Sequence, residues 1–276
     1  MSQGATLLPK GEPLQLSWHG AVALLKPPGW DEAQLTAVFS TRLGGVSDGT
    51  YRAMNPSLSS GDDPLLVAEN RRRLLLATGA ADWPVAVVQQ VHGAKVAVVS
   101  ELSEVGWPLK SREQADAQVT NRTGVLLAIV VADCVPILLW AKSGQGVAVI
   151  HAGWRGSAAG VTEAAVQELC RLCSVRPDQI EAAIGPAIGP ECYPVGAEVR
   201  QEILRNHAWA LAETADGRVD LASLQAEILR REGLKPASIV TSRLCTSCQE
   251  HLLFSYRRDG QRSGRMAALI GLKKQE

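Results

Sequence analysis

The chain lacks an excess of charge of either sign. Its 276 residues include 28 basic and 28 acidic side chains, which leave no formal net charge at pH 7. Proteins that bind nucleic acids or anionic membranes broadly carry a basic surplus, because phosphate groups attract cations. The composition therefore predicts neither a nucleic-acid nor a membrane partner.

The chain also has no recognisable secretory signal, since its first ten residues lack a basic start followed by a long apolar stretch. Residues 125–140 form the one membrane-like run, but this run is short for a membrane span and holds Asp133 and Pro136. We interpret it as a pair of buried strands. We therefore expect a cytoplasmic protein whose six cysteines stay reduced and act as packing residues, metal ligands or nucleophiles.

Low-complexity linkers and internal repeats are missing as well. The hydrophobic content of 46% and the length suit one large domain over residues 1–276. Patterning predicts strands at 38–42, 84–91, 95–100, 125–140, 146–150, 180–184, 238–241, 252–256 and 266–270, and helices at 65–78, 157–173, 195–206 and 221–232. We expect 84–91 and 95–100 to form a hairpin. This mixture indicates an α/β or α+β fold with a sheet-rich centre.

Reactive side chains interrupt two of the apolar runs. Asp133 and Cys134 stand inside the first run, and His151 ends the second one, just before a Gly-Trp-Arg-Gly turn. A buried carboxylate or imidazole costs free energy unless it is paired, ligated or used. Because the two runs are expected to be neighbouring strands, the thiol and the imidazole are predicted to share a site.

His92 has the same context, an apolar strand followed by a tight turn. Two imidazoles and one thiolate suit Zn²⁺, and three protein ligands leave the fourth position open, as in catalytic zinc sites. Such a metal lowers the pKa of its water to about 7. On spacing alone, His92, Cys134 and His151 could equally be separate, hydrogen-bonded core residues.

Several motifs give the chain a resemblance to the laccase-domain (YfiH-like) family, whose members are also named polyphenol oxidases, peptidoglycan editing factors and purine nucleoside phosphorylases. The motifs are FSTRLGG at 39–45, QVHG at 90–93, ADCVP at 132–136, HAGWRG at 151–156, IGPAIGPECY at 184–193, CTSC at 245–248 and FSYRR at 254–258. The resemblance covers residues 38–271. It implies a layered α/β/β/α fold with mixed central sheets, as in cysteine hydrolases of this type, and a zinc ion held by His92, Cys134 and His151.

The resemblance also implies phosphorolysis of adenosine, inosine and S-methyl-5'-thioadenosine, together with adenosine deamination. Phosphorolysis needs an anion pocket, and arginines of the motifs could clamp phosphate, with Arg42 and Arg155 as the first candidates. Zinc deaminases use a His-X-Glu motif that this sequence lacks. We assign Asp133 to supporting the site. The leading hypothesis is a zinc-dependent purine nucleoside phosphorylase with adenosine deaminase activity.

Four other functions remain open from the sequence. A cysteine hydrolase would use Cys134 as nucleophile, His151 as base, and Asp133 or a backbone group to orient the imidazole. A peptidoglycan editing amidase would cleave a wrongly loaded UDP-muramyl precursor with the same metal. A non-enzymatic module would close a structural zinc with a fourth protein ligand. A full multicopper laccase does not fit five histidines without a His-X-His pair, although a polyphenol oxidase with one Cu²⁺ in the three-residue site does.

Two Cys-X-X-Cys pairs, Cys170 with Cys173 and Cys245 with Cys248, suggest a four-cysteine zinc site. The interval between the pairs is too long for a zinc ribbon, and the first pair falls on a predicted helix. We therefore expect packing roles for Cys170 and Cys173, a pocket position for Cys245, a structural role for Cys248, and no second zinc.

Overall fold

A computed structural model describes residues 7–100, 105–108, 113–142 and 145–274, in which the strands form two mixed six-stranded sheets. The first sheet has the order β1 (Gln15–His19), β2 (Val22–Lys26), β3 (Leu35–Ser40), β12 (Met266–Leu272), β7 (Leu126–Val131) and β4 (Val85–Val87). The second has the order β11 (Ile239–Thr241), β10 (Ile180–Ile184), β8 (Val135–Ala141), β9 (Gly146–Ala152), β6 (Ala117–Thr120) and β5 (Val96–Val98). Three outer pairs, β4·β7, β5·β6 and β10·β11, are parallel, and the other pairs are antiparallel.

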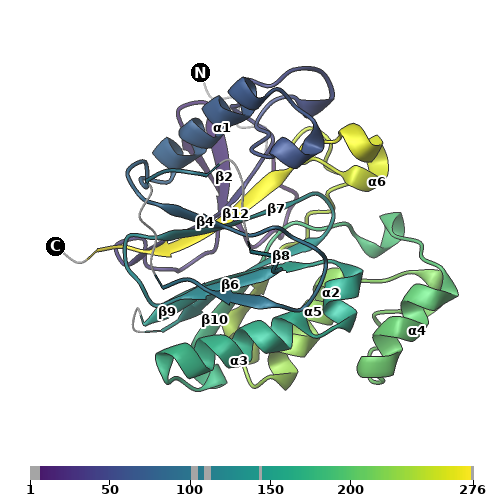
Figure 1. Cartoon of the computed structure of the whole chain (residues 1–276). Helices are drawn as coiled ribbons and strands as arrows, with labels where there is room; N and C mark the ends of the chain where they lie inside the picture. Colours follow the sequence, from purple (N-terminus) through teal and green to yellow (C-terminus); the bar gives the residue numbers. More distant parts are fainter. Residues whose placement is uncertain (1–6, 101–104, 109–112, 143–144, 275–276) are drawn as a thin grey trace.

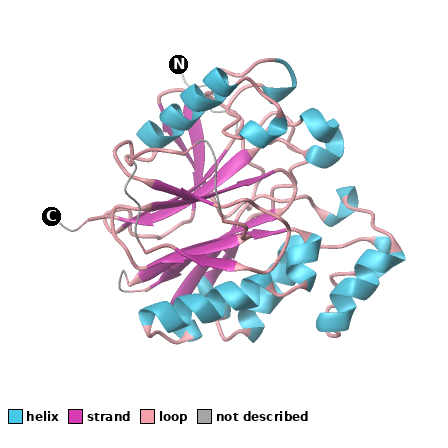
Figure 2. Cartoon of the chain, in the orientation of Figure 1, coloured by secondary structure: helices cyan, strands magenta, loops and turns pink. Residues whose placement is uncertain are grey.

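Helices cover the outer faces of the two sheets, which stack against each other (Figures 1 and 2). The helices are α1 (Pro64–Ala77), α2 (Trp154–Ala158), α3 (Val161–Cys173), α4 (Ala197–Asn206), α5 (Leu221–Arg231) and α6 (Tyr256–Asp259). Helix α1 lies on the first sheet, and α3 and α5 lie on the second. The predicted α/β class and its α/β/β/α layering are confirmed.

The core between the sheets draws on both of them. Phe39 and Leu127 of the first sheet pack in one apolar cluster with Leu138 and Val149 of the second. Strands with both faces buried do not alternate between apolar and polar residues. This explains the unbroken apolar run that the sequence shows at residues 125–140. A single domain over 1–276 stays our prediction.

That run supplies two buried strands, as predicted, but the strands belong to different sheets. Strand β7 lies in the first sheet and β8 in the second. Residues 132–134 therefore carry the chain from one sheet to the other. The predicted neighbours β8 and β9 do pair antiparallel.

The predicted hairpin of residues 84–91 and 95–100 is wrong. Strand β4 ends at Val87 and pairs with β7, whereas β5 pairs with β6 in the second sheet. The segment between them is a second crossing from sheet to sheet, and it contains His92. The apolar pattern marked both strands but could not show that each had a partner elsewhere.

Two further elements differ from the sequence prediction. The helix predicted over residues 157–173 is broken into α2 and α3 at Gly160, whose φ of 85° is left-handed. Residues 252–256 form no strand, because Leu252 and Phe254 fill the core from a loop and α6 begins at Tyr256. Within the described residues, no helix is long and apolar enough to cross a membrane. Residues 1–6, part of the segment searched for a signal, lie outside them.

Candidate active site

The two crossings and the end of β9 bring three ligand-type side chains together. The ligand atoms of His92, Cys134 and His151 all lie within 4.8 Å of one another. The two imidazole rings meet edge to face at 4.8 Å between centroids, and Cys134 Sγ lies 3.9 Å from His92 Nε2. The structure thus groups the three predicted ligands, and separate core positions no longer describe them.

Strand register explains why Cys134 meets His151. In the β8·β9 pair, Pro136 lies opposite His151 and Val135 lies opposite Ala152. Cys134 precedes this ladder directly, so its side chain emerges at the same sheet end as the imidazole. His151 is buried, Cys134 is half-buried and His92 is exposed, which leaves the group accessible from one side.

Left-handed backbone occurs at both crossings. His92 has a φ of 60° and Asp133 a φ of 87°, in a region that L-residues other than glycine rarely adopt. Such strain persists only where surrounding contacts hold it, and it collects at functional sites. At both places the turn aims a side chain, His92 itself or the following Cys134, into the group.

Gly153 allows the three donors to approach one another. A Cβ atom at this position would lie 2.9 Å from Cys134 Sγ and 3.0 Å from His92 Cδ2. Both separations are shorter than a carbon atom tolerates beside a sulfur or a ring carbon. The glycine of the Gly-Trp-Arg-Gly turn is therefore required by close packing against the donors.

Asp116, which sequence reasoning missed, organises both histidines. Its fully buried carboxylate accepts hydrogen bonds from the backbone N–H groups of Val91, His92 and Gly93 at 3.2, 2.9 and 2.7 Å. It also lies 2.8 Å from His151 Nδ1. The one signal in the sequence is an aspartate at the start of an apolar strand, which is too common to single it out.

Gln90 explains part of the QVHG motif. Its side-chain amide donates to the Val130 carbonyl at 2.8 Å and accepts from the Val130 N–H at 2.9 Å. The Gln90 side chain thus makes the hydrogen bonds to β7 that a neighbouring strand would make, at a point beyond the end of β4 at Val87. This contact fixes the segment that presents His92.

Charges within the group perturb its protonation. Burial alone would raise the pKa of the Cys134 thiol, but His151 and His92 outweigh burial and lower that pKa to about 6. Burial alone would lower the pKa of His151, whereas Cys134 and Asp116 raise it to about 9. Burial also opposes ionisation of Asp116, but hydrogen bonds from His151 and the backbone lower its pKa. The thiolate and the carboxylate are thus the favoured forms.

The donor set fits a metal ion. Imidazole nitrogen and thiolate sulfur are the ligands of Zn²⁺, and of copper in sites of this composition. Among the residues that the structure describes, no fourth side chain joins this group. Asp116 behind His151 supplies the carboxylate that commonly orients a metal-binding histidine.

A pocket of about 700 Å³ opens over the group. Its walls combine the aromatic side chains of Trp154, Tyr193 and Tyr256 with cationic side chains, among them Arg155 and Arg257. Aromatic rings provide stacking faces, and guanidinium groups bind anionic oxygens. The pocket can therefore take a flat heterocycle together with an anion beside the three donors.

Asp133 lines the same pocket, but both its carboxylate oxygens are engaged. One accepts from Thr246 Oγ1 and the other from the Arg257 N–H, each at 2.6 Å. The Asp133 carbonyl accepts from the Ile188 N–H at 3.0 Å. These contacts hold the crossing that carries Cys134. His151 is oriented by Asp116 rather than by Asp133, which corrects the orienting role considered from the sequence.

Of the two arginines favoured from the sequence, Arg155 lies at the pocket and Arg42 lies elsewhere. Arg42 donates to the carbonyls of Arg52 and Glu250 at 2.8 and 2.7 Å, and its guanidinium stacks on Phe254. It borders a different hollow, beside His251. Arg42 therefore connects two loops through its hydrogen bonds, and it does not line the pocket over the three donors.

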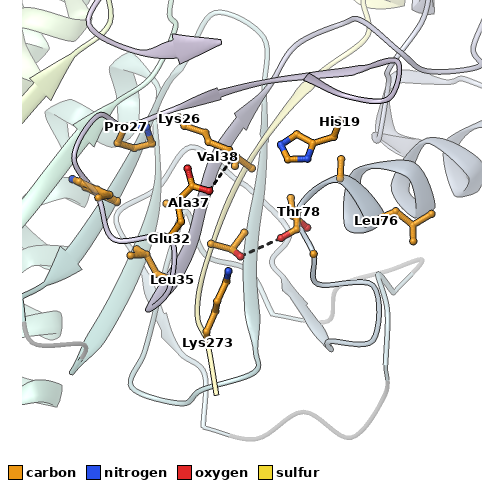
Figure 3. A pocket seen from close by; sticks show the side chains of 14 residues that line it. His19, Lys26, Pro27, Glu32, Leu35, Ala37, Val38, Leu76, Thr78 and Lys273 are labelled. Carbon is orange, nitrogen blue, oxygen red and sulfur yellow. Dashed lines mark hydrogen bonds and ion pairs between the residues drawn. The ribbon is translucent and has the colours of Figure 1, made fainter. Parts of the chain in front are cut away.

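A separate cavity of about 270 Å³ lies between the end of α1 and the first sheet (Figure 3). Lys26 forms an ion pair with Glu32 at 3.0 Å on its wall, and Thr36 donates to the Thr78 carbonyl. Among its described lining residues, His19 is the one imidazole and no thiol accompanies it. The cavity does not share the chemistry of the larger pocket.

The remaining histidines do not gather into a copper cluster. His19 lies at the smaller cavity, His251 at the hollow beside Arg42, and His207 is buried with its ring against the Ser157 carbonyl at 3.0 Å. In the described part of the chain, the second potential metal group consists of cysteines alone. The trinuclear centre of a multicopper laccase therefore has no set of ligands there.

Comparisons with known proteins agree with this geometry. The chain is 39% identical over 242 residues to "Purine nucleoside phosphorylase YfiH" of Shigella flexneri, covering 86% of this chain and 94% of that protein. It is 34% identical over 238 residues to "Adenosine deaminase RL5" of an unknown prokaryotic organism, covering 82% and 90%. The crystal structure of YlmD from Geobacillus stearothermophilus superposes with a TM-score of 0.85 at 34% identity, covering 95% of this chain and 100% of that one.

These relatives carry the names of enzymes that act on small molecules, which supports an enzyme here. The family described as "Multi-copper polyphenol oxidoreductase laccase" matches residues 36–273. The chain therefore belongs to this laccase-domain family, as its motifs predicted.

Proposed function

We propose that the protein is a zinc-dependent purine nucleoside phosphorylase that also deaminates adenosine. The observation that carries the proposal is a group of two imidazoles and one thiol that opens into a pocket with both aromatic and guanidinium walls. Relatives named for both activities support it. The proposed substrates are adenosine, inosine and S-methyl-5'-thioadenosine.

His92, Cys134 and His151 would hold the ion, and Asp116 would keep both imidazoles in place. When bound, Zn²⁺ supplies a Lewis acid that lowers the pKa of water to about 7. The absence of a fourth side chain among the described residues favours a catalytic over a structural ion. Asp133 is proposed as a positioning residue, because it clamps the crossing through Thr246 and Arg257.

Phosphorolysis joins a phosphate oxygen to C1' of the ribose while the bond from C1' to the purine nitrogen breaks. The guanidinium groups of Arg155 and Arg257 would bind the phosphate, and Tyr193 or Trp154 would stack on the purine. Deamination adds water at C6 of adenine and releases ammonia. Deamination would require C6 of the purine beside the three donors, whereas phosphorolysis would require C1' beside the bound phosphate.

A cysteine hydrolase is the second candidate, and a specific observation favours it. Cys134, His151 and Asp116 stand in the order of a nucleophile, base and orienting carboxylate, with 2.8 Å between His151 Nδ1 and Asp116. A thiolate that binds zinc is a poor free nucleophile. Metal content of the active protein therefore separates the two candidates.

The decisive experiment incubates the protein with adenosine, with and without phosphate, and measures its zinc and copper content. Ribose 1-phosphate with adenine, and inosine, are the expected products. Parallel reactions with a serine-loaded UDP-muramyl precursor and with a phenol in the presence of Cu²⁺ test the amidase and the polyphenol oxidase. Activity in metal-free protein, or turnover of the muramyl precursor alone, would refute the proposal.

Arg155→Ala tests the phosphate role. Loss of one charge-assisted hydrogen bond predicts a rise of about tenfold in the KM for phosphate. The matched control is Arg176→Ala, because Arg176 is exposed and pairs with Asp178. An unchanged KM for phosphate in Arg155→Ala would remove this arginine from the anion site.

A further inference from the structure

A second cluster of soft ligands lies apart from the His92–Cys134–His151 group. The sulfurs of Cys192, Cys245 and Cys248 all lie within 4.8 Å of one another. Cys192 ends the short 3-10 turn η4 (Pro190–Cys192), and the other two belong to the CTSC motif. The Sγ atoms of Cys192 and Cys248 are 3.4 Å apart.

The local backbone prepares Cys245 as a thiolate ligand. The Gly189 N–H donates to its sulfur at 3.2 Å, and the backbone N–H groups of Ser247 and Cys248 also donate to it. Hydrogen bonds from positions two and three residues further on require a tight turn that folds the backbone around the first sulfur. Donors converging on a sulfur stabilise its charged form.

The spacing of the sulfurs matches metal coordination. With Zn–S bonds of about 2.3 Å, two sulfurs of a tetrahedral site are separated by about 3.8 Å. The cluster spans this distance with small adjustments of side chains that are exposed or half-buried. We propose that Cys192, Cys245 and Cys248 form a second metal site that binds one Zn²⁺ through three thiolates. None of these three cysteines lines the pocket over the first group, so the ion would hold the two turns together rather than act on a substrate.

This proposal departs from our sequence-based expectation of a chain without a second zinc. That expectation paired the CTSC motif with Cys170 and Cys173, which lie on α3 and take no part in the cluster. The third ligand comes instead from a different motif, IGPAIGPECY. Cys173 also differs chemically, because burial raises the pKa of its thiol to about 11.

A disulfide between Cys192 and Cys248 is the competing use of the same sulfurs. A disulfide would leave Cys245 unpaired, although three backbone N–H groups converge on its sulfur and stabilise the thiolate form that binds metals. Arg258 holds the CTSC turn from outside, since it donates to the Thr246 and Ser247 carbonyls at 3.0 and 3.1 Å. Its charge is balanced by Asp259, whose carboxylate lies 2.7 Å from the guanidinium.

The site would connect two walls of the substrate pocket. Cys192 precedes Tyr193, whose ring lines the pocket. Cys245 precedes Thr246, whose hydroxyl holds Asp133 at 2.6 Å. A metal between these segments would fix the aromatic wall and the crossing that carries Cys134.

The test counts metal ions in the full chain under reducing conditions without chelator. Protein stripped of metal is loaded with Zn²⁺, freed of excess ion, and measured by mass spectrometry. We expect two zinc ions per chain in the wild type, and one each in Cys134→Ala and in Cys245→Ser/Cys248→Ser. In Co²⁺-loaded protein, the double variant should lose most of the sulfur-to-cobalt absorption and Cys134→Ala the smaller part, since the sites contribute three thiolates and one.

Cys170→Ser/Cys173→Ser is the matched control, because it also removes two thiols and is expected to keep both ions. If the double variant fails to fold, Cys248→Ala replaces it, since Cys248 is exposed. The proposal is overturned if the cluster variants bind as much zinc as the wild type. A single zinc that Cys134→Ala loses and the cluster variants keep has the same meaning, whereas a single zinc lost only in the cluster variants contradicts the proposed function instead. A Cys192–Cys248 disulfide in the reduced preparation overturns it too. None of these results depends on enzymatic activity.

Discussion

The two clusters of ligand-type side chains are built on different kinds of backbone. His92, Cys134 and His151 come from two sheet crossings and a strand end, and a buried carboxylate supports them. Cys192, Cys245 and Cys248 come from turns, with backbone N–H groups as their support. The first group faces a pocket of about 700 Å³.

The difference shows how the surroundings decide what similar donors can do. Strand ends hold side chains rigidly, and the pocket over the first group leaves room for a substrate, so this group suits catalysis. The three sulfurs of the second cluster lie on turns and do not line this pocket, so an ion there would hold the turns together rather than meet a substrate. Removing one donor from each group is the strongest test of this contrast.

Cys134→Ser is expected to have the largest effect on activity. It replaces a thiolate by a hydroxyl that binds zinc poorly, so we predict a loss of more than about 100-fold in kcat/KM. Cys248→Ser is expected to lower the melting temperature and to cost less activity. Steady-state kinetics and thermal melts of both variants check this. A larger activity loss in Cys248→Ser would reverse the roles assigned to the two clusters.

Asp116→Asn is expected to cause the second-largest loss of metal affinity and activity. The amide keeps the shape, but it cannot accept all the hydrogen bonds that the carboxylate receives from residues 91–93 and His151. Loss of such a partner behind a metal ligand lowers metal affinity or activity by about 10- to 100-fold. Zinc titration with a competing indicator measures the affinity. Asp178→Asn, at an exposed pair, is the control.

How far the sequence predicted this site depends on where each residue lies. Cys134 and His151 interrupt apolar runs, so their positions were visible, and neighbouring strands brought them together as expected. His92 was grouped by a similar context, although its strand has a different partner from the one predicted. Asp116 could not be found, because its importance arises from a register that places it beside His151.

The fold shows the same limit. Buried strands and the helices α1 and α5 were predictable from local pattern, and the structure shows Asp63 and Asp220 as the N-caps of these two helices. The assignment of β7 and β8 to different sheets was not, because an apolar strand fits either sheet. The sequence did not group Cys192 with the CTSC motif either, because the two lie far apart in the chain and only folding brings Cys192 to Cys248.

Gly153→Ala tests the close packing of the first group. Its methyl group would push Cys134 or His92 away by several tenths of an ångström, which we expect to cost about 1–3 kcal/mol of stability and to weaken metal binding. Gly93→Ala is the comparison, because a Cβ there has ordinary contacts at 3.7 Å. Equal melting temperatures and zinc affinities for the two variants would contradict the argument.

Thr246→Val is expected to have the smallest effect on metal binding and activity, because Thr246 belongs to neither group of donors, and it asks whether the two clusters communicate. Valine keeps the shape but removes the hydroxyl that donates to Asp133, a charged hydrogen bond of about 1.5–3 kcal/mol. Thr246 lies inside the CTSC turn, so this bond is one described link between the cysteine cluster and the crossing that carries Cys134. Gly189 and Ile188 form another, since they donate to Cys245 Sγ and to the Asp133 carbonyl. If the clusters communicate through Thr246, the losses of Thr246→Val and Cys248→Ser in kcat/KM will not add in the double variant. Strictly additive losses would mean that the second ion, where bound, stabilises the fold without reaching the pocket.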